Sequence, residues 1–404
     1  MLVEIHGAGF VNKGAQLMLE TAATEIRERV PDVEFCISAG GDRPAYEAGK
    51  AGFRLLWPTY NLVNRSRKFP YLFRLSRVAA KLTPHRFLAR YGLTSRRRVD
   101  AFVDVSGYAF GDAWLPNYLK NTAAIATYYH RNGKPVVFLP QMFGPFQNEN
   151  SHKPLKELVS NSDLIYAREQ SSYDALKEVV PKAANISIAP DITIFRTLKT
   201  ADQPDEASST IPIDQSSPYA VLTPNIRVLD RQMTDWTREA YVSCFRKVAT
   251  QLIDKGFQVV LLVHETEGKD FVLADEISDS LPQDQCHIFS HDNPVLLKSV
   301  ISRASLMVGS RYHGLVSSLS TGVPAIALGW AYKYTELLSD FGVREFDISS
   351  SKMAGAIPGL LDQLTTPESH RLLVQKLLKQ RDSLKVENVA MWNSVVKVLT
   401  QSSS

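Results

Sequence analysis

The feature that most constrains the fold is a repeated alternation of short apolar segments and amphipathic stretches. The chain opens with an alternating segment over 2–6, typical of a strand, then a glycine-rich turn over 7–14 and a helical pattern over 15–30. A second strand pattern follows at 33–38. Strand–helix–strand units of this kind build parallel sheets, because parallel strands need a crossover connection, which a helix supplies.

This rhythm runs twice along the chain. The first series ends near 186–191 and the second begins at 219–223, and the polar stretch between them is rich in Ser, Pro and Asp. We therefore expect an α/β protein with two Rossmann-like doubly wound domains facing a cleft. The predicted parts are an N-terminal domain over 1–199, a linker over 200–218, a C-terminal domain over 219–366 and a helical tail over 367–404.

Composition excludes several classes of protein. No apolar run approaches the roughly eighteen residues of a membrane span, and the N-terminus lacks the basic start of a signal peptide, so we expect a cytoplasmic protein. The cysteines, Cys36, Cys244 and Cys286, form no CxxC pair, which argues against a zinc knuckle or a disulfide framework. We see no cluster of metal-ligand type and expect neither a metal nor another cofactor.

Positive charge is concentrated in one segment. Residues 48–99 hold 13 Lys and Arg and no Asp or Glu, whereas the whole chain has a net charge of only +4. Such local charge argues against a generic nucleic-acid binder. Apolar residues at helical spacing over 72–82, interleaved with basic ones, suit a surface helix on an anionic membrane, at the inner face of the cell membrane. A solvated insertion packed on the first domain is equally compatible with this pattern.

One turn carries more chemistry than any other. Arg311-Tyr312-His313-Gly314 follows a buried strand pattern over 304–310 and precedes a helical pattern. Arginine offers a rigid fork of donors for phosphate or carboxylate, and a histidine two residues later can transfer a proton. The free N–H groups at the start of a helix also favour an anion. The turn is therefore our candidate anion site, although an internal ion pair and a helix cap would explain it too.

Other polar residues follow predicted strands, where ligands of doubly wound sheets bind. Each has a structural explanation as well, such as a tight turn, an internal ion pair or a solvated side chain. Their shared position at strand ends is what makes them candidates for substrate binding. They are Asn12, Lys13, Gly107, Arg168, Asn225, Arg227, His264 and Lys333.

The chain resembles the polysaccharide pyruvyl transferase family along most of its length. Its most specific stretch runs from Ser310 to Gly314 and continues through 322–324 and 332–334. Weaker matches occur earlier, at 12–15, 106–107, 111–112, 140–141, 144–146, 163–169, 172–173 and 190–191. Two departures stand out: Ala15 replaces an Asp common in the family, and Tyr108-Ala109 interrupts a glycine-rich loop.

The resemblance implies two Rossmann-like domains like those of GT-B glycosyltransferases. It also implies transfer of an enolpyruvyl unit from phosphoenolpyruvate to a sugar, giving a pyruvate ketal in exopolysaccharide, capsule or cell-wall glycan synthesis. Phosphoenolpyruvate carries a phosphate and a carboxylate, so we expect at least two cationic clamps, Arg311 and Arg168, with Lys333 as a third. His313 is the candidate general acid for the methylene carbon. The departures leave the acceptor, a lipid-linked oligosaccharide or nucleotide sugar on the N-terminal domain, less constrained than the donor.

Two rival functions share these features. A sugar-nucleotide glycosyltransferase with the same fold would bind a diphosphate at the Arg311 turn. The acidic ribose ligand usual in such enzymes is not obvious here, although Glu336 could be argued for that role. A non-catalytic glycan-binding subunit is compatible with Ala15, but the presence of both Arg311 and His313 argues against it.

Overall fold

The computed structural model describes residues 1–404 except 39, 41–44, 58–82, 113–115, 199–210, 212, 214–216, 230–233, 266–267, 330 and 402–404. The chain forms two compact units. Unit 1 comprises Met1–Val11, Met18–Ile192 and Glu387–Ser404, and unit 2 comprises Asn12–Leu17 and Thr193–Val386. The predicted linker, 200–218, and the predicted amphipathic helix, 72–82, fall almost wholly outside the described residues.

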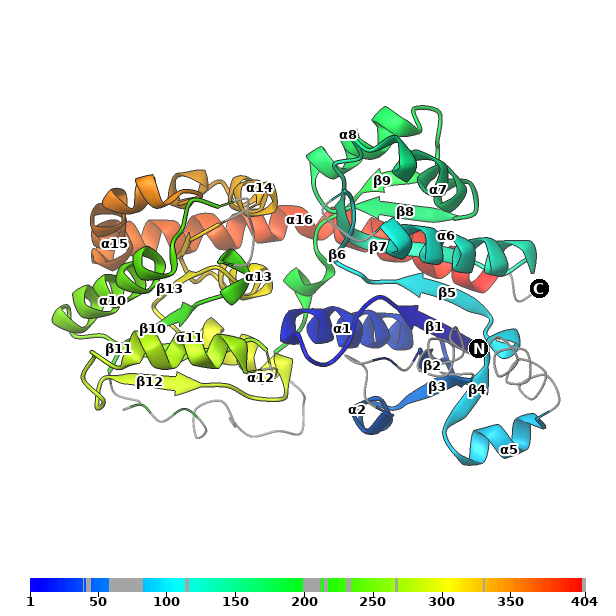
Figure 1. The fold of residues 1–404 in the computed structure, drawn as a ribbon, viewed down its shortest axis with the longest axis horizontal. Coiled ribbons are helices and arrows are strands. Elements are labelled where there is room, and N and C mark those ends of the chain that lie inside the picture. The colour runs from blue at the N-terminus through cyan, green and yellow to red at the C-terminus, as the bar shows by residue number, and fades with distance from the viewer. Residues whose placement is uncertain are drawn as a thin grey trace. The chain divides into compact units, whose positions relative to one another are not determined.

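Unit 1 is built on a parallel sheet (Figure 1). The strand order is β4-β3-β2-β1-β5-β7-β8-β9, and β6 pairs with β7. The strands are β1 (Leu2–His6), β2 (Glu34–Ile37), β3 (Phe53–Trp57), β4 (Leu93–Ser95), β5 (Ala101–Asp104), β6 (Tyr108–Phe110), β7 (Val136–Phe143), β8 (Leu164–Ala167) and β9 (Ile186–Ile188). The order reverses between β1 and β5, where ligands of doubly wound sheets bind. At that point His6 lies opposite Asp104 in the register.

The core of unit 1 explains why its strands are so apolar. All residues of β1, β5 and β7 are buried, as expected for parallel strands that are covered on both faces. Phe102, Phe138, Tyr129 and Leu158 belong to one hydrophobic cluster formed by strands and helices. The helices of unit 1 are α1 (Lys13–Arg29, from Met18 on), α2 (Ala45–Lys50), α5 (His85–Arg90), α6 (Pro116–Arg131), α7 (Glu149–Ser160) and α8 (Gln170–Val179).

Unit 2 has its own parallel sheet, in the order β12-β11-β10-β13-β14 (Figure 1). The strands are β10 (Tyr219–Thr223), β11 (Gln258–Leu262), β12 (Cys286–Phe289), β13 (Leu306–Gly309) and β14 (Ala325–Ala327). The helices are α10 (Arg238–Asp254), α11 (Lys269–Ser278), α12 (Pro294–Ser302), α13 (Tyr312–Ser320), α14 (Tyr332–Asp340) and α15 (Ile357–Thr365). The strand order reverses between β10 and β13, so the Arg311 turn lies at the switch point of this sheet.

The longest helix and the first helix each contribute to both units. α16 (Pro367–Gln401) passes into unit 1 at Glu387, where Trp392 is buried and the Arg29 guanidinium lies 5.6 Å from its ring centroid. The first turn of α1 groups with unit 2, because Asn12 forms a β-bridge with Glu265. This turn lies within the predicted N-terminal domain, 1–199.

Two further details differ from the sequence prediction. The segment after Gly107, predicted as a loop, includes the short strand β6, which pairs with an extension of β7 beyond Pro140. The Met142 N–H donates to the Gly107 carbonyl at 2.8 Å, so the buried backbone of this extension is satisfied. No helix within the described residues is long and apolar enough to cross a membrane.

Candidate active site

The turn that carries Arg311 is held from three sides. Ser310 follows β13, and its carbonyl accepts hydrogen bonds from the Asn225 amide at 2.9 Å and the Tyr334 hydroxyl at 2.8 Å. The Tyr241 hydroxyl donates to Ser310 Oγ at 2.7 Å. Burial raises the pKa of Tyr241, so this hydroxyl remains protonated. The turn is therefore rigid, as a binding site on a scaffold requires.

His313 lies within the first turn of α13, not before it. The sequence pattern placed the turn 311–314 before a helix, but α13 begins at Tyr312 and Arg311 is its N-cap residue. The Arg311 side chain makes no capping hydrogen bond. The backbone N–H groups at this helix start carry a partial positive charge, which favours a bound anion beside His313.

Arg311 is oriented by a buried carboxylate. Its Nε donates to Asp270 Oδ2 at 2.8 Å, and its Nη2 donates to the same oxygen. The other Asp270 oxygen accepts the Ile226 N–H at 3.0 Å. Burial raises the pKa of Asp270, and the nearby Arg311 charge opposes that rise. The ion pair fixes one edge of the guanidinium while 12% of the Arg311 side chain stays exposed.

The start of α1 adjoins His313. The Lys13 N–H donates to the His264 carbonyl at 3.0 Å, and Asn12 Oδ1 accepts the Gly14 N–H at 3.0 Å. A methyl group added to Gly14 would lie only 2.7 Å from His313 Cγ, so glycine is what allows this approach. Two helix N-termini, those of α1 and α13, therefore meet at one imidazole. Both helix starts place partial positive charge beside that imidazole.

His264 completes the polar surroundings of the turn. It is buried, and its pKa is lowered to about 3, first by burial and then by the charges of Arg311 and His313. The ring is thus neutral at pH 7. Within the part of the chain that the structure describes, its Nε2 atom is buried without a hydrogen-bond partner. A buried polar atom of this kind costs free energy unless a water or a ligand satisfies it.

Two lysines add positive charge to unit 2. Lys333 is buried on α14, with its Nζ atom 5.4 Å from the ring centroids of both Tyr312 and Tyr334. Lys13 Nζ donates to Gln16 Oε1 at 3.0 Å and lies 3.7 Å from a carboxylate oxygen of Asp292. Lys333 therefore lies near the turn itself, at Tyr312. Lys13 is linked to this region by its backbone N–H, which donates to the His264 carbonyl.

Asn225 and Arg227 support the same region in different ways. Asn225 Oδ1 accepts the Arg227 N–H at 3.0 Å and so caps the short 3-10 helix η3 (Ile226–Val228). With its amide on Ser310, the Asn225 side chain is committed to internal hydrogen bonds. The Arg227 side chain is exposed.

Two of the predicted residues belong to unit 1. Arg168 follows β8, and its guanidinium donates to Glu169 at 2.8 Å and to Asp191 at 3.1 Å, with 3% of the side chain exposed. This is the internal ion pair that the sequence left open as its structural explanation. Gly107 has φ +70°, a conformation that favours glycine, in the turn after β5.

Asp270, the second residue of α11, could not be predicted as a site residue, because no sequence motif marks it. Its partner Arg311 lies 41 positions away, and the contact arises only when β11 and β13 flank β10. Among the residues that the structure describes, no group of three or more His, Cys, Asp or Glu side chains could hold a metal ion.

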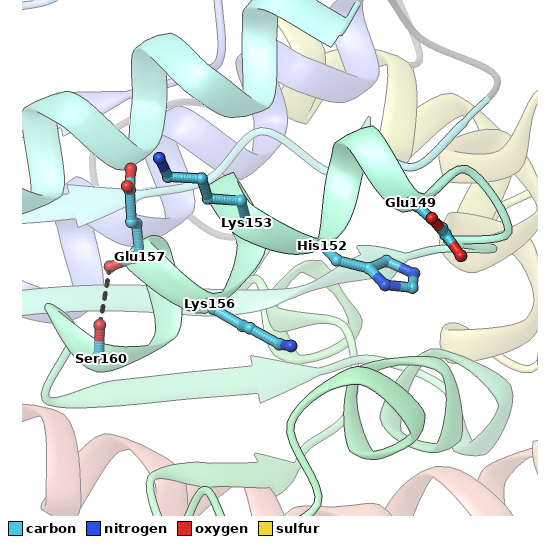
Figure 2. A pocket seen from close by; sticks show the side chains of 6 residues that line it. All are labelled: Glu149, His152, Lys153, Lys156, Glu157 and Ser160. Atoms are coloured by element: carbon cyan, nitrogen blue, oxygen red, sulfur yellow. Dashed lines mark hydrogen bonds between the residues drawn. The ribbon is translucent and has the colours of Figure 1, made fainter.

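A depression elsewhere on unit 1 is a weaker candidate. Figure 2 shows that its side chains all come from α7. They are Glu149, His152, Lys153, Lys156, Glu157 and Ser160. The one hydrogen bond drawn among them, from the Ser160 hydroxyl to the Glu157 carbonyl at 3.3 Å, is local to the helix (Figure 2). This is the solvated face of one helix, and it includes none of the predicted site residues.

Comparison with known proteins identifies the family. The sequence profile of the polysaccharide pyruvyl transferases matches residues 12–332, which is most of the chain. The chain belongs to the polysaccharide pyruvyl transferase family. A curated relative, the amylovoran biosynthesis protein AmsJ of Erwinia amylovora, is 22% identical over 277 residues. That match covers 66% of this chain and 63% of the relative's length.

Solved structures confirm the GT-B-like fold of the chain. The UDP-GlcNAc 2-epimerase of Neisseria meningitidis has a TM-score of 0.57 at 12% identity, over 97% of this chain and 100% of that one. The UDP-GlcNAc 2-epimerase of Methanocaldococcus jannaschii scores 0.55 at 12% identity, over 90% and 93%. Anabaena HepE, solved with UDP, scores 0.53 at 13% identity, over 99% of both chains. At these identities the likeness concerns the fold alone.

Proposed function

We propose that this chain transfers the enolpyruvyl unit of phosphoenolpyruvate to a sugar and closes a pyruvate ketal on it. The observation that carries the proposal is the convergence of Arg311, His313 and two helix N-termini at the switch point of unit 2. Phosphoenolpyruvate combines two anionic groups with a carbon that must be protonated. That substrate therefore needs cationic donors and an acid in one place.

The donor's anions match the charges of the turn. Arg311, already oriented by Asp270, binds one anionic group through its exposed edge, and the N–H groups at the start of α13 bind the other. Lys333 lies behind Tyr312 and adds positive charge in a buried setting, where screening by water is weak. The neutral His264 supplies Nε2 for a polar atom of the donor.

The reaction balances without a cofactor. His313 gives a proton to the methylene carbon, which becomes a methyl group, while positive charge develops on the adjacent carbon. A sugar hydroxyl bonds to that carbon, and the carbon–oxygen bond to phosphate breaks. A second hydroxyl then closes the ring. The two hydroxyl protons balance the one taken up by carbon and the one carried by the released phosphate.

Arg168 stays a predicted second clamp for phosphoenolpyruvate, but its surroundings favour this role less than those of Arg311 do. Two carboxylates already neutralise its guanidinium in the interior of unit 1. Lys333 and the helix N-termini are the better second source of positive charge, because they contact the turn itself. Asn12, Lys13 and Asn225 act in this proposal by positioning the turn through their backbone and amide contacts.

The acceptor is a sugar of an exopolysaccharide, capsule or cell-wall glycan, presented as a nucleotide sugar or on a lipid carrier. We place the protein in the cytoplasm, with peripheral contact to the inner face of the membrane. Phe87 and Tyr91, in and just after α5 of the basic segment, are 56% and 62% exposed, with ring centroids 5.1 Å apart. Exposed aromatics beside Arg86 and Arg90 suit an anionic lipid surface.

Vesicle co-sedimentation tests the membrane contact. At low salt, vesicles containing phosphatidylglycerol should pull down the protein, and purely phosphatidylcholine vesicles should not. The double variant Phe87→Ser, Tyr91→Ser should bind the anionic vesicles more weakly than the unaltered chain. Absence of the unaltered protein from both pellets would contradict the proposal.

Incubation with phosphoenolpyruvate tests the main proposal. The acceptors are UDP-galactose, UDP-glucose, UDP-N-acetylglucosamine and UDP-N-acetylmannosamine, together with lipid-linked oligosaccharides from bacterial membranes. We expect phosphate release and an acceptor product with the added mass of a pyruvate ketal. Sugar transfer from the nucleotide, with no use of phosphoenolpyruvate, would favour the glycosyltransferase alternative. Glycan binding without turnover of either donor would favour a non-catalytic subunit.

A further inference from the structure

We propose that a polar cluster at the strand ends of unit 1 binds a sugar through its hydroxyl groups. The site is built from unit 1 alone, and binding there needs no group of unit 2. The preference for hydroxyl groups follows from the hydrogen bonds of the cluster, and that the hydroxylated ligand is a sugar rests on the proposed function. The members of the cluster are His6, Asp104, Ser106, Tyr118 and Gln141.

The cluster lies where ligands of a doubly wound sheet bind. The strand order of unit 1 reverses between β1 and β5, and His6 and Asp104 end these two strands, directly opposite in the register. Gln141 lies in the extension of β7 beyond Pro140, and β7 is the next strand of the sheet (Figure 1). Gly107, a predicted substrate-binding residue, follows the end of β5. Three neighbouring strands thus bring polar side chains to the switch point of this sheet.

Asp104 orients the other members of the cluster. It is fully buried, and one of its oxygens accepts the Ser106 N–H and the Gln141 amide, each at 3.0 Å. Its other oxygen accepts the Ser106 hydroxyl at 3.0 Å and the His6 Nδ1 proton at 2.8 Å, because a carboxylate only accepts. These donors fill the roughly four lone-pair sites that a carboxylate offers. Asp104 therefore positions its neighbours and has little capacity left to bind a cation itself.

Two side chains that Asp104 holds each have a second polar atom without a partner among the described residues. His6 Nε2 makes no hydrogen bond there, although the His6 side chain is nine-tenths buried. Gln141 Oε1 is buried and also has no partner, in a residue with no exposed surface. A buried polar atom of this kind costs free energy until a water or a ligand bonds to it. The two atoms therefore mark the position of a polar ligand.

The chemistry of the two atoms favours a hydroxyl group over an anion. An amide oxygen only accepts, so the partner of Gln141 Oε1 must donate, which a carboxylate or a fully ionised phosphate cannot do. His6 Nε2 accepts in a neutral imidazole and donates in an imidazolium, and a hydroxyl can bond to it in either case. The buried charge of Asp104 also repels an anion. A sugar carries several hydroxyl groups and is the hydroxylated substrate of the proposed function.

Ser106 and Tyr118 make the cluster rigid. Their hydroxyl oxygens lie 2.9 Å apart, and the Ser106 hydroxyl donates to Asp104, so the Tyr118 hydroxyl donates to Ser106. The His6 ring lies against Phe102 and Tyr118, with ring centroids 5.4 and 6.2 Å away. These contacts and the bond to Asp104 fix the imidazole, so Nε2 keeps one position for a ligand, as a binding site requires.

The first experiment follows the histidine ring signals of the isotope-labelled full chain by NMR, without phosphoenolpyruvate. The probes are the methyl glycosides of galactose, glucose, N-acetylglucosamine and N-acetylmannosamine, which carry hydroxyl groups and no charge. The His6 signal is identified by its loss in His6→Asn and His6→Gln. We expect at least one glycoside to shift this signal saturably, while the His152 signal stays in place. Inorganic phosphate at the same pH should leave the His6 signal unchanged.

The variant His6→Asn tests the hydrogen bond at Nε2. The asparagine Nδ2 can replace Nδ1 as donor to Asp104, so the fold is preserved while Nε2 is lost. The affinity for the glycoside, measured by saturation-transfer NMR, should fall about fivefold or more, as expected for one lost hydrogen bond. His152→Asn is the matched control and should bind like the unaltered chain, because His152 also has one ring nitrogen bonded, to the Phe146 carbonyl at 2.8 Å.

The outcomes separate this site from the proposed function. No shift of the His6 signal with any glycoside, or an equal shift with phosphate, would overturn the site while the proposed function stands. Unchanged glycoside affinity in His6→Asn would do the same. A shifted His6 signal in a chain that releases no phosphate from phosphoenolpyruvate with any of the acceptors would overturn the proposed function and leave a sugar site in unit 1.

Discussion

Arg168 of unit 1 and Arg311 of unit 2 were both predicted to bind the donor, but their electrostatic surroundings differ. Each follows a strand of a parallel sheet, and each is paired with a buried carboxylate. Arg168 has two such partners, Glu169 and Asp191, and 3% of its side chain is exposed. Arg311 has one, Asp270, and 12% is exposed.

The difference shows that a position at a strand end does not by itself decide whether an arginine can bind an anion. A guanidinium neutralised by two carboxylates has little attraction left for an incoming anion, whereas one with a single partner keeps a hydrogen-bonding edge and a share of its charge. The surroundings add to this contrast. Arg311 is the N-cap residue of α13, and the start of α1 adjoins His313, whereas Glu169 separates Arg168 from the start of α8.

The largest expected effect is a fall in kcat when His313 of unit 2 is replaced. If His313 is the acid, His313→Ala should lower kcat about 100-fold to 10,000-fold, the usual range for general acid catalysis, with little change in phosphoenolpyruvate binding. Steady-state kinetics with a phosphate-release assay measures both. The control is His287→Ala on β12, which should behave normally. Turnover near that of the unaltered chain in His313→Ala would remove His313 from the mechanism.

A single methyl group tests the approach of α1 to this histidine. Gly14→Ala places a Cβ 2.7 Å from His313 Cγ, so the imidazole must shift. We expect kcat to fall at least tenfold, because catalytic groups must stay within about half an ångström of the productive geometry. Gly49→Ala is the matched control, since a Cβ there meets nothing within 4 Å. Equal kinetics in the two variants would show that His313 needs no fixed position.

Replacing each arginine in turn tests whether Arg168 and Arg311 differ in donor binding. Arg168→Gln leaves two buried carboxylates without their cation and should cost about 3–5 kcal/mol of unfolding free energy. Its KM for phosphoenolpyruvate should stay within about threefold. Arg311→Gln should also lose stability, and a second change, Asp270→Asn, should recover it without recovering donor affinity. Urea unfolding and kinetics provide the readouts, and a large rise in KM in Arg168→Gln would reinstate Arg168 as a clamp.

The smallest predicted effect concerns pH. The folded pKa of His264, about 3, lies below its unfolded value near 6.5, so the unfolded chain binds more protons in this range. Stability from this residue is full above pH 6.5 and is lost as pH falls towards 3, which amounts to about 2 kcal/mol at pH 5. His264→Gln should therefore lose less stability than the unaltered chain between pH 7 and 5. Equal losses in this variant and in the unaltered chain would contradict the lowered pKa of His264.

Much of the fold could be predicted from the sequence because parallel strands buried on both faces leave a clear apolar rhythm. The start of α1 could not, since its bridge to Glu265 joins residues more than two hundred positions apart. The Arg311 turn was visible because its residues are contiguous. Asp270 and the His6–Asp104 pair were not, because their contacts depend on which strands become neighbours.

The most direct test of the central claim is a calorimetric titration of phosphoenolpyruvate. The three proteins to compare are the unaltered chain, Arg168→Gln, and the double variant Arg311→Gln, Asp270→Asn, each first shown to be folded by its urea unfolding curve. We predict that the unaltered chain and Arg168→Gln bind with affinities within about threefold, and that the double variant binds at least tenfold more weakly. Equal affinity in the double variant, or a loss confined to Arg168→Gln, would contradict the assignment of the donor site to the Arg311 turn.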